Sequence, residues 1–149
     1  YGRQWDRIPA FVNYLGIKRN SDAEYTDRFP VSLLCPVSRG ALHDLQNGTG
    51  NVTSSYGMSY ATVWDTTRVY RLKRPSSSAS WTDALDWMLY NSNMPGYLAN
   101  EESMAGDGRV AYRHSQSLNA GMLDGHVTNY SYRYLQLPEN FNRMLKNFY

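Results

Sequence analysis

The sequence predicts an α+β fold: a mostly antiparallel sheet with long loops, a short N-terminal helix and a C-terminal helix. Three observations lead to this prediction. Apolar residues recur at helical spacing near both ends, alternating apolar and polar residues fill several runs between them, and an Asp-Gly pair separates two strand-like runs. At 149 residues, the chain is long enough for a single globular domain, 1–149, with a substantial core.

Both predicted helices have recognisable ends. The first begins near Ile8, because Pro9 suits a first turn and interrupts a longer helix, and Gly16 is a typical stop. In the second, Pro138 suits the first turn and is followed by an apolar stripe. The stripe consists of Phe141, Met144, Leu145 and Phe148.

Asp124-Gly125 predicts a tight two-residue hairpin, since a type I′ turn needs positive φ at both central residues. In this register Met122 faces Val127 and Ala120 faces Asn129. The core face would then carry Leu118, Ala120, Met122 and Val127. The other face would carry Asn119, Gly121, His126, Thr128 and Tyr130.

Further strands are predicted over residues 29–34, 56–66, 80–88 and 110–112, from alternation and β-branched or aromatic content. Residues 38–55 read as a loop with a turn of helix around Leu42 to Leu45, and residues 91–108 as a long polar loop.

His114, nine intervening residues and Asp124-Gly125 resemble the C-terminal H-X9-DG signature of bacterial prepilin-type, or pseudopilin-like, surface proteins. Other family pieces occur in the same order. They are the Trp5 to Leu15 segment, the Phe29 to Pro36 segment with its Cys35-Pro36, Ser55-Tyr56-Gly57-Met58, and Arg74-Pro75-Ser76. Together these pieces span most of the chain.

The resemblance implies a pilin-like globular head and a non-enzymatic structural subunit of a type II secretion or type IV pilus-like apparatus. Such a protein is extracytoplasmic, in the cell envelope or at the surface, and is anchored in the inner membrane before assembly. Family members begin with a leader and an apolar helix, whereas these residues contain no apolar run of the roughly 20 residues that a span needs. The resemblance therefore implies a preceding anchoring helix, through which the head would reach the membrane and other pilin-like subunits.

Composition leaves one alternative of a different class. The net charge of +2 is scattered, which gives a nucleic-acid partner little support, and no small-molecule substrate is indicated. Thirteen Tyr and four Trp against four Phe suit a wet surface or an interface. The alternative is an extracytoplasmic carbohydrate-binding module with exposed stacking rings, for which the candidates are Trp64, Trp81, Trp87 and Tyr97.

Cys35 is the only cysteine, which argues against a disulfide or a thiolate metal site within these residues. We expect a small buried hydrophobe at a strand end. The resemblance adds a second interpretation, in which its partner is a cysteine just after the anchoring helix. A catalytic thiol is least favoured, because no activating base lies nearby in sequence.

His114, Asp124 and His126 have the side chains of a metal site or an acid/base pair, but Asp124 should point away from the hairpin end. We therefore expect His114 to bond the Asp124 carboxylate or the turn backbone and to fix the preceding loop. A hydrolase using His114 and Asp124 is a third hypothesis, although the sequence has no GxSxG elbow, P-loop, HExxH or dinucleotide fingerprint.

No cofactor is expected, with calcium as the one possibility to test. Oxygen-rich loops suit calcium, and some pseudopilins that this chain resembles carry a calcium site in the C-terminal region. The candidates are Glu101, Glu102 and Asp107, with Asp83 and Asp86 as further acidic residues.

Overall fold

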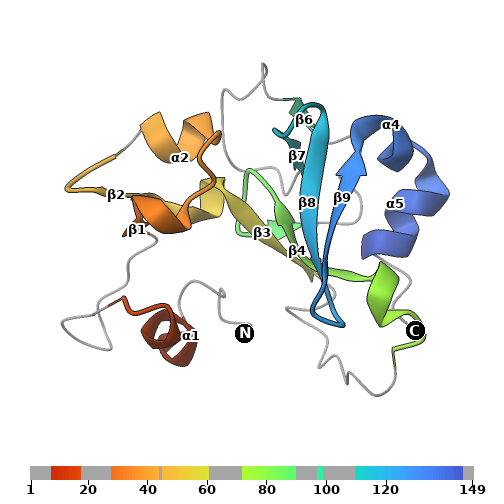
Figure 1. The fold of residues 1–149 in the computed structure, drawn as a ribbon, viewed down its shortest axis with the longest axis horizontal. Helices are drawn as coiled ribbons and strands as arrows, with labels where there is room; N and C mark the ends of the chain where they lie inside the picture. The colour runs from red at the N-terminus through yellow and green to blue at the C-terminus, as the bar shows by residue number, and fades with distance from the viewer. Residues whose placement is uncertain are drawn as a thin grey trace.

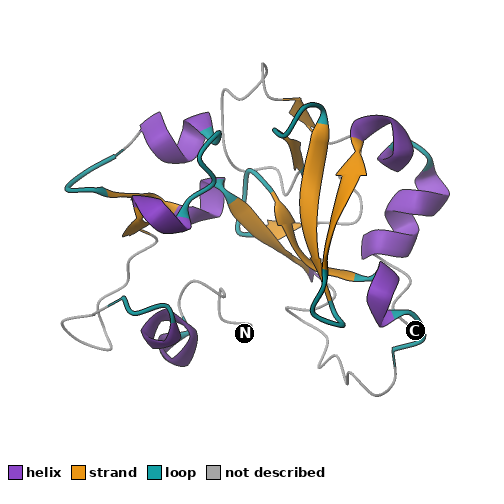
Figure 2. Cartoon of the chain, in the orientation of Figure 1, coloured by secondary structure: helices purple, strands orange, loops and turns teal. Residues whose placement is uncertain are grey.

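The computed structural model describes residues 8–17, 28–43, 45–60, 72–89, 97–98 and 110–145. It contains helices and sheets, which confirms a mixed α+β fold (Figures 1 and 2). In these ranges, no helix is both long and apolar enough to cross a membrane.

A five-stranded sheet with strand order β5-β3-β4-β8-β9 organises the fold, and Figure 1 labels β3, β4, β8 and β9. Neighbouring strands are antiparallel except for β3 and β5, which are parallel. The strands are β3 (Tyr56–Ser59), β4 (Ala79–Asp83), β5 (Met88–Leu89), β8 (Ser117–Met122) and β9 (Val127–Ser131). Two small sheets pair β1 (Arg28–Pro30) with β2 (Thr49–Asn51) and β6 (Tyr97–Leu98) with β7 (Ala111–Tyr112).

Helix α1 (Pro9–Tyr14) begins and ends as the sequence predicts. Pro9 stands in its first turn, where a missing N–H breaks no helical hydrogen bond. Gly16 follows the helix at φ +73°, and the N–H groups of Gly16 and Ile17 bond the carbonyls of Asn13 and Val12. This pattern is a Schellman motif, which satisfies carbonyls that the helix end would leave without partners.

The remaining helical segments are short, apart from the predicted C-terminal helix α5 (Pro138–Leu145). The Ser131 hydroxyl caps α4 (Tyr132–Leu135) by accepting a bond from the Tyr134 N–H. In the part of the chain that the structure describes, the others are α2 (Arg39–His43) and the 3₁₀ turns η2 (Val31–Leu33), η3 (Val52–Ser54) and η5 (Pro75–Ser77).

Among the described residues, two larger apolar clusters pack against the sheet. Leu118, Ala120 and Met122 of β8 belong to the first cluster, together with the predicted stripe of α5, Phe141, Met144 and Leu145. The second cluster joins α1, β1, α2 and η3 through Val12, Phe29, Leu34, Ala41 and Val52. Tyr56 and Met58 of β3 and Trp81 of β4 pack against this second cluster, so the sheet contributes to both.

Two predicted strands are shorter than expected. The segment 29–34 leaves the extended conformation after Pro30 and continues as η2. The segment 80–88 ends as a strand at Asp83, and the chain then returns so that β5 pairs with β3. Of the predicted strand 56–66, the structure describes residues 56–60, and β3 covers Tyr56–Ser59.

The predicted hairpin exists, but its turn and register differ. Asp124 does not have positive φ; Gly125 alone does, at +96°. The Gly125 N–H bonds the Met122 carbonyl and the Met122 N–H bonds the His126 carbonyl. This is a three-residue loop with glycine in the bulge position, an alternative that an Asp-Gly pair also permits.

The extra loop residue shifts the pairing by one position, so Gly121 faces Val127 and Ala120 faces Thr128. Because side chains alternate, a one-residue slip moves a whole strand to the opposite face. Leu118, Ala120 and Met122 are buried as predicted, whereas Val127 is 71% exposed and its assignment to the core was wrong. Tyr130 packs against the core instead.

Candidate functional site

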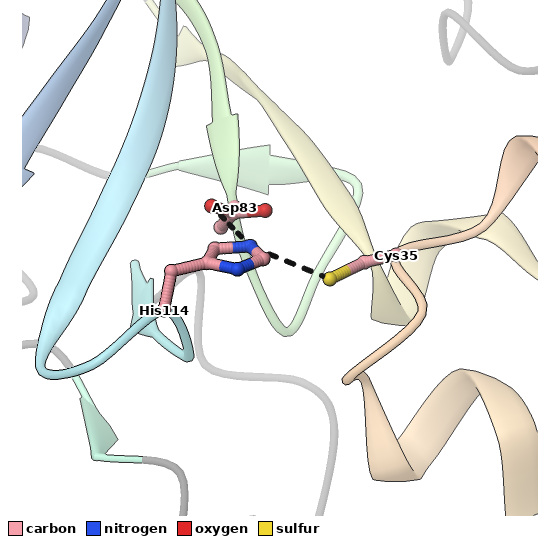
Figure 3. A group of neighbouring side chains, drawn as sticks. All are labelled: Cys35, Asp83 and His114. Atoms are coloured by element: carbon pink, nitrogen blue, oxygen red, sulfur yellow. Dashed lines mark hydrogen bonds and ion pairs between the residues drawn. The ribbon is translucent and has the colours of Figure 1, made fainter.

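His114 lies in the tight turn between β7 and β8 (Figure 3). Its N–H bonds the Ser117 carbonyl at 3.0 Å, and the Ser117 N–H bonds the His114 carbonyl at 3.1 Å. Ser115 and Gln116, the two central residues, have φ of 53° and 59°. Two positive φ values with reciprocal bonds define a type I′ turn, here formed without glycine and therefore strained. Strained turns of this kind persist where the surrounding structure holds them, often at functional sites.

Two other segments bring side chains to the His114 ring. Cys35 follows η2, and its backbone N–H bonds the Ser55 hydroxyl at 3.1 Å. Asp83 ends β4, and its carboxylate accepts a 2.7 Å bond from the Asn119 N–H of β8. The three side chains thus come from points separated by 48 and 31 residues, each fixed by a backbone hydrogen bond (Figure 3).

The three side chains converge on one nitrogen. His114 Nε2 is 3.6 Å from Cys35 Sγ and 3.3 Å from Asp83 Oδ2. All three donor atoms lie within 4.8 Å of one another. Cys35 and Asp83 are almost fully buried, while the His114 side chain keeps 30% of its surface exposed. The cluster is consequently closed on two sides and reachable by solvent on the histidine side.

Arg113 hydrogen-bonds to two segments of the chain beside the cluster. Its buried guanidinium donates to the carbonyls of Ser55 at 2.9 Å, Ser54 at 2.7 Å and Ala84 at 2.7 Å. These carbonyls belong to η3 and its following residue, and to the residue after β4. Because the guanidinium fork is rigid, Arg113 fixes the spacing between Ser55, whose hydroxyl accepts the Cys35 N–H, and Ala84, which follows Asp83.

Burial dominates the electrostatics of the cluster. It raises the pKa of the Asp83 carboxyl, against the opposing effects of the Asn119 N–H, His114 and Arg113. Burial also raises the pKa of the Cys35 thiol. Tyr56, across from Asp83 in the β3–β4 pair, has its pKa raised to about 12, first by burial and then by Cys35 and Asp83. The site therefore disfavours negative charge unless a cation accompanies it.

This arrangement differs from a Cys-His-Asp relay. In such a relay the acid bonds one ring nitrogen and the nucleophile bonds the other. Here the thiol and the carboxylate approach the same Nε2. The raised thiol pKa also runs opposite to the activation of a nucleophilic cysteine. The geometry suits bracing or the ligation of a cation.

The expectation that His114 bonds the Asp124 carboxylate or its turn was wrong. These residues lie at opposite ends of β8, which as a six-residue strand spans about 20 Å (Figure 1). Asp124 instead pairs with His126, with Oδ1 2.5 Å from Nδ1, and His126 Nε2 is 2.8 Å from the Thr128 hydroxyl. The structure thus separates the predicted trio of His114, Asp124 and His126 into two places.

Two of the four proposed sugar-stacking rings, and none of the three proposed calcium ligands, lie fully within the described residues. Trp81 and Trp87 are half-buried and pack against the second core, and Trp81 stacks on Phe11 with ring centroids 5.8 Å apart. Trp64 lies outside the described residues, and Tyr97 is described only as backbone in β6. Glu101, Glu102 and Asp107 also lie outside the described residues.

Sequence reasoning found two members of the cluster but did not group them. Cys35 is buried as expected, yet its lone occurrence excludes only sites built from several thiolates. Asp83 appeared only among the acidic residues. A buried aspartate within a strand of apolar neighbours is the signal that could have singled it out, since buried carboxylates usually have partners.

Comparison with protein-family models, curated proteins and solved structures found no match to this chain.

Proposed function

We propose that the chain is the globular head of a non-enzymatic, pilin-like surface subunit, belonging to a type II secretion or type IV pilus-like apparatus. The supporting observation is the use that the fold makes of the H-X9-DG residues. Gly125 closes one end of β8 by its positive φ, and His114 anchors the other end against Asp83 and Cys35. Both ends of β8, an interior strand of the sheet, are thereby held in place. This gives the motif that carries the resemblance a structural role.

Cys35 and Pro36, the other residues of the resemblance, take part in the same arrangement. Cys35 reaches His114, and Pro36 lies between η2 and α2. The shared Nε2 contact supports a bracing role over a catalytic relay. The proposal therefore assigns these residues to the stability of the head.

The packing of helix α1 on the sheet supports a role in assembly for the N-terminal side of the head. Val12 is fully buried in the second core, and Phe11 stacks on Trp81 of β4. Under this proposal, the anchoring helix precedes α1 in the chain and is separated from it at least by the extended residue Ile8. Under this proposal, that helix contacts the membrane and neighbouring subunits, and the head faces the extracytoplasmic space.

The test is the processing and location of the natural protein in its cell. We expect the full reading frame to encode a leader and an apolar helix before Tyr1, and the mature amino terminus to lie at the leader junction. N-terminal sequencing and membrane fractionation measure both properties, with a strain lacking prepilin peptidase as the control. A mature protein without an apolar helix, recovered in the soluble fraction of both strains, would refute the proposal.

A further inference from the structure

The separation between His114 Nε2 and Asp83 Oδ2 is long for a hydrogen bond. The 3.3 Å from His114 Nε2 to Asp83 Oδ2 exceeds the range of about 2.7–3.2 Å for N–H···O bonds. A neutral ring nitrogen carries at most one hydrogen, so Nε2 cannot donate fully to both the carboxylate and the thiol. The three donor atoms lie within 4.8 Å of one another, close enough to bind one ion.

The two separations from His114 Nε2 match two edges of a tetrahedral zinc site. Zinc binds sulfur at about 2.3 Å, imidazole nitrogen at about 2.0–2.1 Å and carboxylate oxygen at about 2.0–2.2 Å. At the tetrahedral angle, these lengths place nitrogen about 3.6 Å from sulfur and about 3.4 Å from oxygen. The observed distances from Nε2 are 3.6 Å to Cys35 Sγ and 3.3 Å to Asp83 Oδ2.

The surroundings hold the three donors in place before any ion arrives. The Asn119 N–H orients the Asp83 carboxylate, the Ser55 hydroxyl holds the Cys35 backbone, and the type I′ turn aims His114. Hydrogen bonds to ligands of this kind fix their orientation and tune metal affinity. The partly exposed face of His114 supplies an entry route.

The ligand chemistry selects the class of ion. One thiolate and one carboxylate together balance a divalent charge, and a mixed set of sulfur, nitrogen and oxygen donors suits zinc. Calcium and magnesium prefer oxygen alone.

We propose that Cys35, Asp83 and His114 form a binding site for a zinc-class divalent transition metal, with a fourth position open to water or an external ligand. On binding, the Cys35 thiol loses its proton to solvent as the metal–sulfur bond forms. The site does not depend on the pilin-like function proposed above, because its argument uses only the geometry of these side chains.

The experiment titrates the reduced chain with Co²⁺, which reports thiolate ligation through a sulfur-to-cobalt charge-transfer absorption. We expect one Co²⁺ per chain with this absorption, and its displacement by Zn²⁺ but not by Ca²⁺. Wild-type protein should also melt at a higher temperature when Zn²⁺ is added, because binding stabilises the native state.

Three variants and one control separate this site from others. Cys35→Ser should abolish the charge-transfer absorption. Asp83→Asn and His114→Gln should weaken Co²⁺ binding by more than about tenfold, at least the loss seen when a hydrogen-bond partner of a metal ligand is changed. The double variant Asp124→Asn, His126→Ala removes the exposed Asp–His pair at the other end of β8 and should leave the titration unchanged.

Circular dichroism checks that each variant folds; should Asp83→Asn unfold, Cys35→Ser decides, since it replaces one atom of a small side chain. No Co²⁺ binding by folded wild-type protein would overturn the proposal. Binding without the charge-transfer absorption, or an absorption that survives Cys35→Ser, would overturn it equally. Processing of the natural protein at a leader is measured separately, so failure of either proposal leaves the other intact.

Discussion

Replacing Arg113 with Met should destabilise this domain, because it removes the guanidinium and keeps the apolar stem of the side chain. Arg113 is 6% exposed and donates to three carbonyls on two segments. Met fills a similar volume, so the loss isolates the guanidinium. The substitution leaves the carbonyls of Ser54, Ser55 and Ala84 without these donors inside the protein.

The magnitude follows from those three bonds. A hydrogen bond to a charged group contributes about 1.5–3 kcal/mol, but shared groups are not additive and water re-solvates part of the loss. The Ser54 carbonyl keeps the Ser38 hydroxyl and the Ser55 carbonyl keeps the Ala84 N–H, so we expect Arg113→Met to cost about 3 kcal/mol, the upper value for one such bond. Such a loss is a large part of the roughly 5–15 kcal/mol that stabilises an ordinary domain.

Urea unfolding followed by circular dichroism measures the effect as a lower midpoint. Arg113→Lys, which keeps the charge but loses the fork, should lose less than Arg113→Met. The matched control is Arg133→Met on exposed α4, where we expect a change within about 0.5 kcal/mol. A loss below about 1 kcal/mol for Arg113→Met would refute the view that this guanidinium holds the segments together.

Three further substitutions test the turns and the core by thermal or urea unfolding. Gly125→Val should cost about 1–3 kcal/mol, because a β-branched residue would have to hold φ near +96°, and a neutral result would contradict the bulged loop. Gln116→Gly should stabilise by about 1 kcal/mol, since glycine relieves a left-handed position at φ 59°; a lower melting temperature would argue against strain there. Tyr112→Phe should be neutral or slightly stabilising, because among the described residues its buried hydroxyl has no hydrogen-bond partner, and a loss above about 1 kcal/mol would reveal one.

The two turn sequences show how far local chemistry determines a hairpin. Asn47-Gly48 forms a type I′ turn, with φ of 51° and 75° and reciprocal bonds between Gln46 and Thr49. Its sequence signal is the same as that of Asp124-Gly125, which forms a bulged loop instead. The position of the glycine predicts where the chain turns. The register of the two joined strands depends instead on which of their residues gain the most free energy by burial.

The sequence by itself determined the helices at the two ends and the buried face of β8. Pro9, Gly16 and Pro138 mark helix ends through their own backbone restrictions, and the α5 stripe follows from helical period. These are local effects, so the sequence of each segment is enough to predict them.

Only the tertiary structure decided what surrounds His114. Local spacing pointed to Asp124, ten residues away, but an extended strand places residues ten apart at opposite ends of β8. Asp83 and Cys35 reach His114 because β4 pairs with β8 and because Arg113 ties η3 to the end of β4. Pairing between distant strands depends on the packing of the whole core, and this is the physical reason why the cluster appears in the fold and not in the motif.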